Sequence, residues 1–159
     1  MNFNTPEFRW IFPSYKWEDA WMVNQIINRV DCQQLGFRNG VPPETVKHSD
    51  AAITHWIQEN MNGCSCLICF YGEDTGLSKW VSYELALARE RRMGRLYVSL
   101  LGMKKQDGSI CQAGFPPCEC RRDGRPAVAD IGQYYWRDGG ETNIHAWIEQ
   151  AIERAKWPI

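Results

Sequence analysis

Short, continuous apolar runs alternate along the chain with longer stretches in which apolar residues recur at helical spacing. The runs that most clearly predict strands are Phe8–Tyr15, Cys64–Tyr71 and Arg95–Leu101. Weaker strands are expected within residues 35–42 and at Ile131–Trp136. Because proline cannot donate a hydrogen bond to a sheet, the first strand should stop or bend at Pro13.

Amphipathic stretches between these runs predict helices. They are expected from Glu18 to about Val30, over Val46–Asn62, from about Leu77 to Arg92, and after Asn143 as a capping residue. Gly63 is placed to end the second of them. Strands that alternate with helices in this way predict a parallel sheet covered by helices on both faces. The expected fold is therefore a flavodoxin-like α/β arrangement, formed as a single domain over residues 1–159.

The third predicted helix carries a carboxylate where its pattern calls for an apolar residue. At roughly 100° per residue, Glu84 lies near the middle of an apolar arc that also holds Leu77 and Trp80. A carboxylate that faces the interior is costly unless it has partners or lines a cleft. In α/β sheets, ligands bind beyond the carboxyl ends of the strands, where a strand leads through a loop into a helix. Glu84 is thus either a catalytic residue or a structural carboxylate paired with Arg91, Arg92 or a backbone amide.

Composition narrows the functional classes. The 159 residues suffice for one domain with a core, and the net charge of -1 gives no electrostatic footprint for nucleic acid. No run of 18 apolar residues predicts a membrane span, and the N-terminus lacks the pattern of a signal peptide. A cytoplasmic location follows as the expectation, and the seven cysteines are interpreted as reduced thiols.

Three separated segments carry a family resemblance: PSYKWEDAWMVNQIIN from Pro13, WIQENMNG from Trp56 and SKWVSYEL from Ser78. In order and spacing they resemble the TIR-like domain family of the ThsB proteins from Thoeris antiphage defence systems, over about Phe8 to Leu101. The resemblance implies a TIR fold and an enzyme that cleaves nicotinamide from NAD+, an NAD+ glycohydrolase or ADP-ribosyl cyclase. It further implies a cyclic or conjugated ADP-ribose signal that reaches a downstream effector, with homo-oligomer formation on activation. NAD+ is then the substrate, and no cofactor is expected.

The resemblance also assigns roles to individual residues. Glu84 matches the family's catalytic glutamate, and Trp80 is expected either to stack on nicotinamide or adenine or to pack in the core. Asn24 is expected to point at the cleft. The loop after the first strand is expected to contact the dinucleotide through Ser14, Tyr15, Lys16 and Trp17. The chain departs from the family at Pro13, where an aliphatic or aromatic residue is common, and after Leu101.

The chemistry gives a glutamate a reason to be in such a site. Cleavage of the nicotinamide–ribose bond develops oxocarbenium character on the ribose, as in glycoside hydrolysis. A nearby carboxylate can stabilise this cation, hold the ribose hydroxyls or trap the sugar covalently. Nicotinamide departs as a neutral molecule, so no general acid is required.

Three other interpretations remain open. The domain could be a non-catalytic TIR scaffold whose aromatic residues anchor protein contacts, or an enzyme similar to nucleoside deoxyribosyltransferases, which also place a glutamate at a ribose. The third interpretation is a zinc site formed by Cys111, Cys118 and Cys120, which lie in the long segment 102–129. Because the spacing of Cys118 and Cys120 in CEC is too tight for a standard pair of zinc ligands, no metal is expected. That segment is longer than most loops, which indicates a functional or mobile element.

Overall fold

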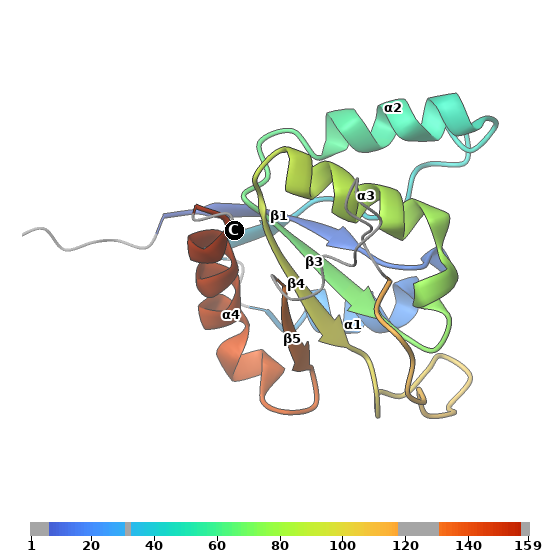
Figure 1. Ribbon diagram of the computed structural model, residues 1–159. Helices are drawn as coiled ribbons and strands as arrows, with labels where there is room; N and C mark the ends of the chain where they lie inside the picture. Colours follow the sequence, from blue (N-terminus) through green and yellow to red (C-terminus); the bar gives the residue numbers. More distant parts are fainter. Residues whose placement is uncertain (1–6, 31–32, 118–130, 157–159) are drawn as a thin grey trace, which may run out of the picture.

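A parallel β-sheet forms the centre of the molecule (Figure 1). The computed structural model describes residues 7–30, 33–117 and 131–156. Within them the strand order is β2-β1-β3-β4-β5, and every neighbouring pair is parallel. The strands are β1 (Arg9–Ser14), β2 (Leu35–Phe37), β3 (Cys66–Tyr71), β4 (Gly94–Ser99) and β5 (Gly132–Tyr135). This order confirms the flavodoxin-like prediction, including both weak strands.

Helices cover both faces of the sheet. The α-helices are α1 (Ala20–Ile27), α2 (Asp50–Asn60), α3 (Lys79–Glu90) and α4 (Gly140–Ala155), and short 3-10 turns η1 (Trp17–Asp19) and η2 (Thr75–Leu77) precede α1 and α3. The helices α1 and α4 pack on one face, whereas α2 and α3 lie together over the other (Figure 1).

Alternation along the strands builds two hydrophobic clusters. Ile11 and Ile68 face the cluster under α1 and α4, and Phe12 and Leu67 face the cluster under α2 and α3. Successive side chains of a strand point to opposite faces, so a sheet covered twice must be apolar at every position. All six residues of β3 are buried accordingly.

The strand β1 runs to Ser14, one residue before the predicted end at Tyr15 and one residue past Pro13, where a stop or bend was expected. The carbonyl of Ile11 accepts a hydrogen bond from the backbone N–H of Arg38, on the side of β2. Pro13, two residues later, faces the same side, but β2 has already ended at Phe37. The missing N–H of proline therefore costs no hydrogen bond of the sheet.

Two predicted helices begin and end elsewhere. The helix α1 ends at Ile27 rather than near Val30. The helix α2 begins at Asp50 rather than Val46, because Ser49 caps it by accepting a hydrogen bond from a backbone N–H of the first turn. Gly63, after its end, has a φ of 79°, which agrees with its predicted place as the residue that lets the chain turn away.

The predictions for the other two helices also need correction. Leu77 is 90% exposed in the turn before α3, so its predicted place on the apolar arc is wrong. Asn143 does not begin α4, which starts at Gly140 with Gly139 as its capping residue. The Asn143 side chain instead donates a hydrogen bond to the Gly139 carbonyl from inside the helix.

Candidate functional site

Glu84 is buried in the interface between α3 and the sheet, with only 2% of its surface exposed. It shares the inner face of α3 with Val81, Leu85 and Ala88, which pack against the strands. This confirms that Glu84 lies on the apolar arc. The Ser14 hydroxyl, at the end of β1, donates a hydrogen bond to the Oε2 atom of Glu84. The structure thus joins the predicted catalytic carboxylate to the first residue of the predicted binding loop.

This pair lies where the connections of the sheet diverge. Ser14 on β1 is in register with Cys69 on the adjacent strand β3. The chain leaves β1 towards β2 on one side, and it leaves β3 towards β4 on the other. Such a switch point is where open α/β sheets form a crevice beyond the carboxyl ends of their strands. The Ser14–Glu84 pair is therefore at the expected position for a ligand site.

Burial dominates the electrostatics of this pair. It raises the pKa of Glu84 to about 8, although the hydrogen bond from Ser14 opposes the rise. Two neighbours are also buried. Their own burial, followed by the charge of Glu84, raises the pKa of Tyr15 to about 12 and raises the pKa of Cys69. In this closed arrangement the Glu84 carboxyl is mostly protonated at neutral pH, and neither neighbour ionises there.

The structure does not support the alternative in which an arginine pairs with Glu84. Arg91 Nη1 donates to the carbonyl of Gln58 and to Asn62 Oδ1, so its guanidinium ties α3 to α2. Among the described residues no ion pair joins Glu84 to Arg91 or Arg92. That interpretation is wrong for both arginines.

The remaining residues of the predicted binding loop diverge after Ser14. Tyr15 is buried and packs with the cluster under α1 and α4. Lys16 points to the β3–α3 loop, where its Nζ atom lies 3.7 Å from a carboxylate oxygen of Asp74. Trp17 packs against the cluster under α2 and α3, with the Lys47 ammonium 4.7 Å from its ring centroid. Ser14, Lys16 and Trp17 thus lie at or near the switch point, and Tyr15 supports it from the other face.

Trp80 and Asn24 lie further from the pair. Trp80 is half-buried one turn before Glu84, and its ring meets the ring of Tyr83 edge-on at 6.2 Å. Asn24 is exposed on α1, which covers the opposite face of the sheet. The expectation that Asn24 points at the same cleft as Glu84 is therefore wrong. The buried side of α1 is occupied by Met22, Val23 and Ile26, so Asn24 lies on the side of the helix that faces solvent.

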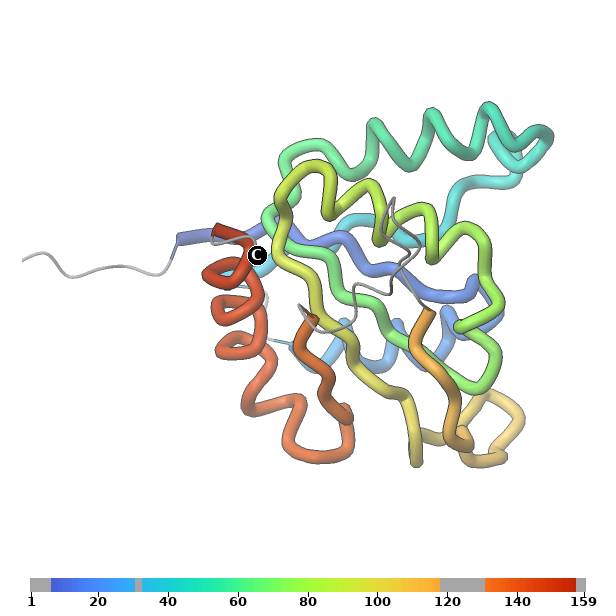
Figure 2. Tube along the Cα trace, viewed as in Figure 1, coloured from blue at the N-terminus to red at the C-terminus, as the bar shows by residue number. Residues whose placement is uncertain are grey.

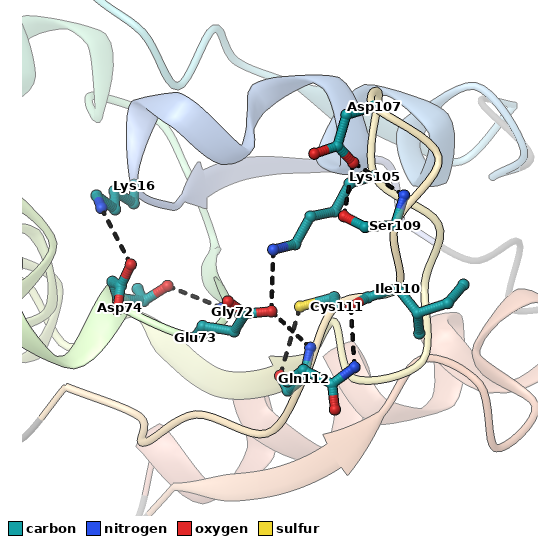
Figure 3. A network of polar contacts seen from close by, with 11 residues as sticks. Lys16, Gly72, Glu73, Asp74, Lys105, Asp107, Ser109, Ile110, Cys111 and Gln112 are labelled. Atoms are coloured by element: carbon teal, nitrogen blue, oxygen red, sulfur yellow. Dashed lines mark hydrogen bonds and ion pairs between the residues drawn. The ribbon is translucent and has the colours of Figure 1, made fainter.

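A polar network ties a distant segment to this edge of the sheet (Figure 3). Glu73, directly after β3, accepts hydrogen bonds from the backbone N–H of Gln112 at 2.7 Å and from Lys105 Nζ at 2.9 Å. These two hydrogen bonds lower the pKa of Glu73, so the carboxylate stays ionised. A turn at Asp107 and Ser109 reverses the chain between the two donors.

Close backbone contact completes this attachment. Figure 2 shows segment 111–117 running beside the chain that leaves β3. A Cβ on Gly114 would lie 2.0 Å from the carbonyl oxygen of Gly72, so only glycine fits. Further along, the Tyr97 hydroxyl of β4 donates to the carbonyl of Pro117 at 2.7 Å. Sequence patterns did not reveal this contact; the glycines at 72 and 114 were its one visible signal.

The cysteine candidates receive no support as a metal centre. Over residues 7–30, 33–117 and 131–156 no group of three or more His, Cys, Asp or Glu side chains could hold a metal ion. Cys111 is buried, and Cys118 and Cys120 lie outside the described residues. Cys64, Cys66 and Cys69 are free thiols at or in β3.

The fold and the site define the class of this protein. A parallel sheet in the order 2-1-3-4-5 is a flavodoxin-like α/β domain, and this one has a buried carboxylate at its switch point. The family model for the TIR-like domain of Thoeris protein ThsB matches residues 12–105, more than half of the chain and a range that includes Ser14 and Glu84. The chain belongs to this family, which suggests a TIR-domain role in Thoeris defence.

Two further observations complete the comparison. A search of curated proteins gives no match. None of the helices in the described part of the chain has the length and apolar character that crossing a membrane would need.

Proposed function

We propose that this protein is an NAD+-consuming enzyme that cleaves the bond between nicotinamide and ribose and uses Glu84 as its catalytic carboxylate. The observation that carries the proposal is the buried Glu84 carboxyl, hydrogen-bonded to Ser14 at the switch point of the sheet. Both residues lie in the range that matches the ThsB family. The released ADP-ribose moiety would become a cyclic or conjugated signal for a downstream effector.

The chemistry assigns each group a task. As the bond to nicotinamide breaks, positive charge grows on the ribose, and an ionised Glu84 would stabilise it at short range. The Ser14 hydroxyl would hold the carboxylate in one orientation by donating to Oε2. The low-dielectric surroundings strengthen this attraction and limit access of water, which favours cyclisation or conjugation over hydrolysis.

The same burial makes the described arrangement a resting state. With 2% exposure, Glu84 cannot touch a ribose until neighbouring groups move. Its pKa of about 8 also leaves it mostly uncharged at neutral pH, and the charged form is the one that stabilises a cation. An opening at this edge would admit NAD+, whose positively charged nicotinamide ring would lower the pKa of the carboxyl without water having to fill the site. Low basal activity is therefore part of the proposal.

The test is NAD+ turnover followed by mass spectrometry, in cells with and without phage and with purified protein. Glu84→Gln keeps the shape of the side chain and removes its charge, and it should abolish the product. The matched control is Glu90→Gln, an exposed glutamate on the same helix, which should retain activity. A product that persists at the wild-type rate in Glu84→Gln would refute the catalytic assignment. Turnover of free nucleosides without NAD+ would favour the deoxyribosyltransferase alternative.

Assembly is a second candidate function, which one surface feature favours. Leu77 is 90% exposed and Phe115 is 83% exposed. The backbone of Phe115 lies against Gly76, so Phe115 is close to the residue that precedes Leu77 in the connection from β3 to α3. Adjacent exposed apolar groups favour a contact with a second copy on activation. Sedimentation of Leu77→Ser should show loss of self-association, and unchanged association would exclude this surface.

A further inference from the structure

A hollow of about 530 Å³ lies between α1, the segment after β4 and the start of α4. It belongs to the face of the sheet opposite Glu84, because Trp136 and Trp21 on its wall pack with the cluster under α1 and α4. Trp136 is buried and Trp21 is half-buried. The volume is in the range of small-molecule sites, and the part of the Trp21 ring that stays exposed gives the wall a flat apolar surface, whereas Gly140 packs against the ring of Trp136.

The charged lining of this hollow is mainly positive. Arg29, Lys104 and Arg137 supply three cations and Glu141 one carboxylate, a net charge of +2 on a chain whose total is -1. Within the described residues none of these cations forms an ion pair. The Arg137 guanidinium lies over the ring of Tyr135, 5.6 Å from its centroid. Unpaired cations around a hollow attract an anion.

The start of α4 adds to this potential. Gly139 and Gly140 line the hollow, and the 16-residue helix begins there without a side-chain cap. The partial positive charge of a helix N-terminus therefore has the same sign as the three side chains. The opposing carboxylate of Glu141 is exposed and free to turn to water.

We propose that this hollow binds a free nucleotide at a site separate from Glu84. Arg29, Lys104 and Arg137 would receive the phosphate, and the planar base would pack on the half-buried ring of Trp21. The volume exceeds what one inorganic phosphate needs, and the indole ring of Trp21 matches a flat ring rather than a sugar phosphate alone. This inference does not depend on the proposed NAD+ chemistry.

The test is isothermal titration calorimetry with adenosine 5′-monophosphate, ribose 5-phosphate, adenosine and inorganic phosphate as separate probes. The monophosphate should bind best, with an affinity that falls as salt rises. Arg137→Gln and Arg29→Gln should each weaken its binding about tenfold, since each removes charged hydrogen bonds. Arg92→Gln, the same change at an exposed arginine outside the hollow, should bind like wild type.

Several results would overturn the proposal. Absence of monophosphate binding by wild type at millimolar concentration would do so. Affinities left unchanged by both Arg29→Gln and Arg137→Gln would place the ligand elsewhere, including at the Glu84 site. Equal affinity for ribose 5-phosphate would remove the base from the assignment. Thermal melting of each variant checks that it folds, and exposed Lys104→Gln provides an independent variant.

Discussion

The buried carboxyl of Glu84 makes the stability of this protein depend on pH in a way that one substitution should remove. The ordinary carboxyl pKa is 4.5, and burial raises the pKa of Glu84 to about 8 in the folded chain. Since the folded pKa is the higher one, the folded chain binds more protons between these values. The neutral side chain gives its full stability below about pH 4.5, and this contribution is lost as the pH rises towards 8. Glu84→Gln cannot ionise and lacks this dependence.

The size of the effect follows from the shift. At 1.36 kcal/mol per pKa unit, ionisation of Glu84 lowers the free energy of unfolding by about 1 kcal/mol at pH 5 and about 3 kcal/mol at pH 7. The loss reaches about 4 to 5 kcal/mol near pH 8.5, a large part of the stability of an ordinary domain. Glu84→Gln should therefore become more stable than wild type as the pH rises. Other titrating groups are common to both proteins and cancel in the difference.

Urea denaturation of both proteins at pH 5, 7 and 8.5 measures this difference through the transition midpoint at unchanged m value. Glu90→Gln is the matched control, because it makes the same change at an exposed glutamate of the same helix. A Glu84→Gln difference that stays constant within about 1 kcal/mol from pH 5 to 8.5 would refute the reasoning. It would mean that the folded carboxyl is hydrated or paired.

Three other predictions concern the same edge of the sheet. Ser14→Ala removes the hydrogen bond that lowers the pKa of Glu84, so the carboxyl should titrate at a higher pH. NMR of the side-chain carboxyl carbon measures this titration, and an unmoved midpoint would show that the hydroxyl does not stabilise the charge. Basal NAD+ turnover should rise with pH up to about 8, because ionisation of the buried Glu84 destabilises the closed state and so favours the opening that admits NAD+. A flat rate from pH 6 to 9 would contradict this link between ionisation and opening. Gly114→Ala would place a Cβ 2.0 Å from the Gly72 carbonyl oxygen, and the resulting displacement should lower the free energy of unfolding by about 1–3 kcal/mol, as urea denaturation measures. Ala113→Ser, a change at an exposed neighbour, should be close to neutral. Equal stabilities of the two variants would show that segment 111–117 is not held against Gly72.

Prediction from the sequence succeeded where a local pattern decides the structure. The strand β3 and the inward position of Glu84 could be predicted from the order and spacing of apolar residues within short segments. Helix ends were less certain, because Ser49 begins α2 through a side-chain hydrogen bond and Gly139 begins α4 by its backbone conformation. The position of Leu77 was mispredicted for the same reason. The spacing of apolar residues places Leu77 on the apolar face of a helix, but it does not show that the helix begins two residues later, at Lys79.

The sequence by itself determined the type of fold and the carboxylate of α3 that breaks the apolar pattern, because the spacing of apolar residues is a property of short segments. Only the tertiary structure decided what that carboxylate meets. The Ser14–Glu84 hydrogen bond joins residues 70 positions apart, and Glu73 receives Gln112 from a segment with no pattern of its own. The tertiary structure also placed Asn24 on the far side of the sheet. Such contacts depend on which strand ends lie side by side. The order of the strands in the sheet decides this, and that order exists only in the folded chain.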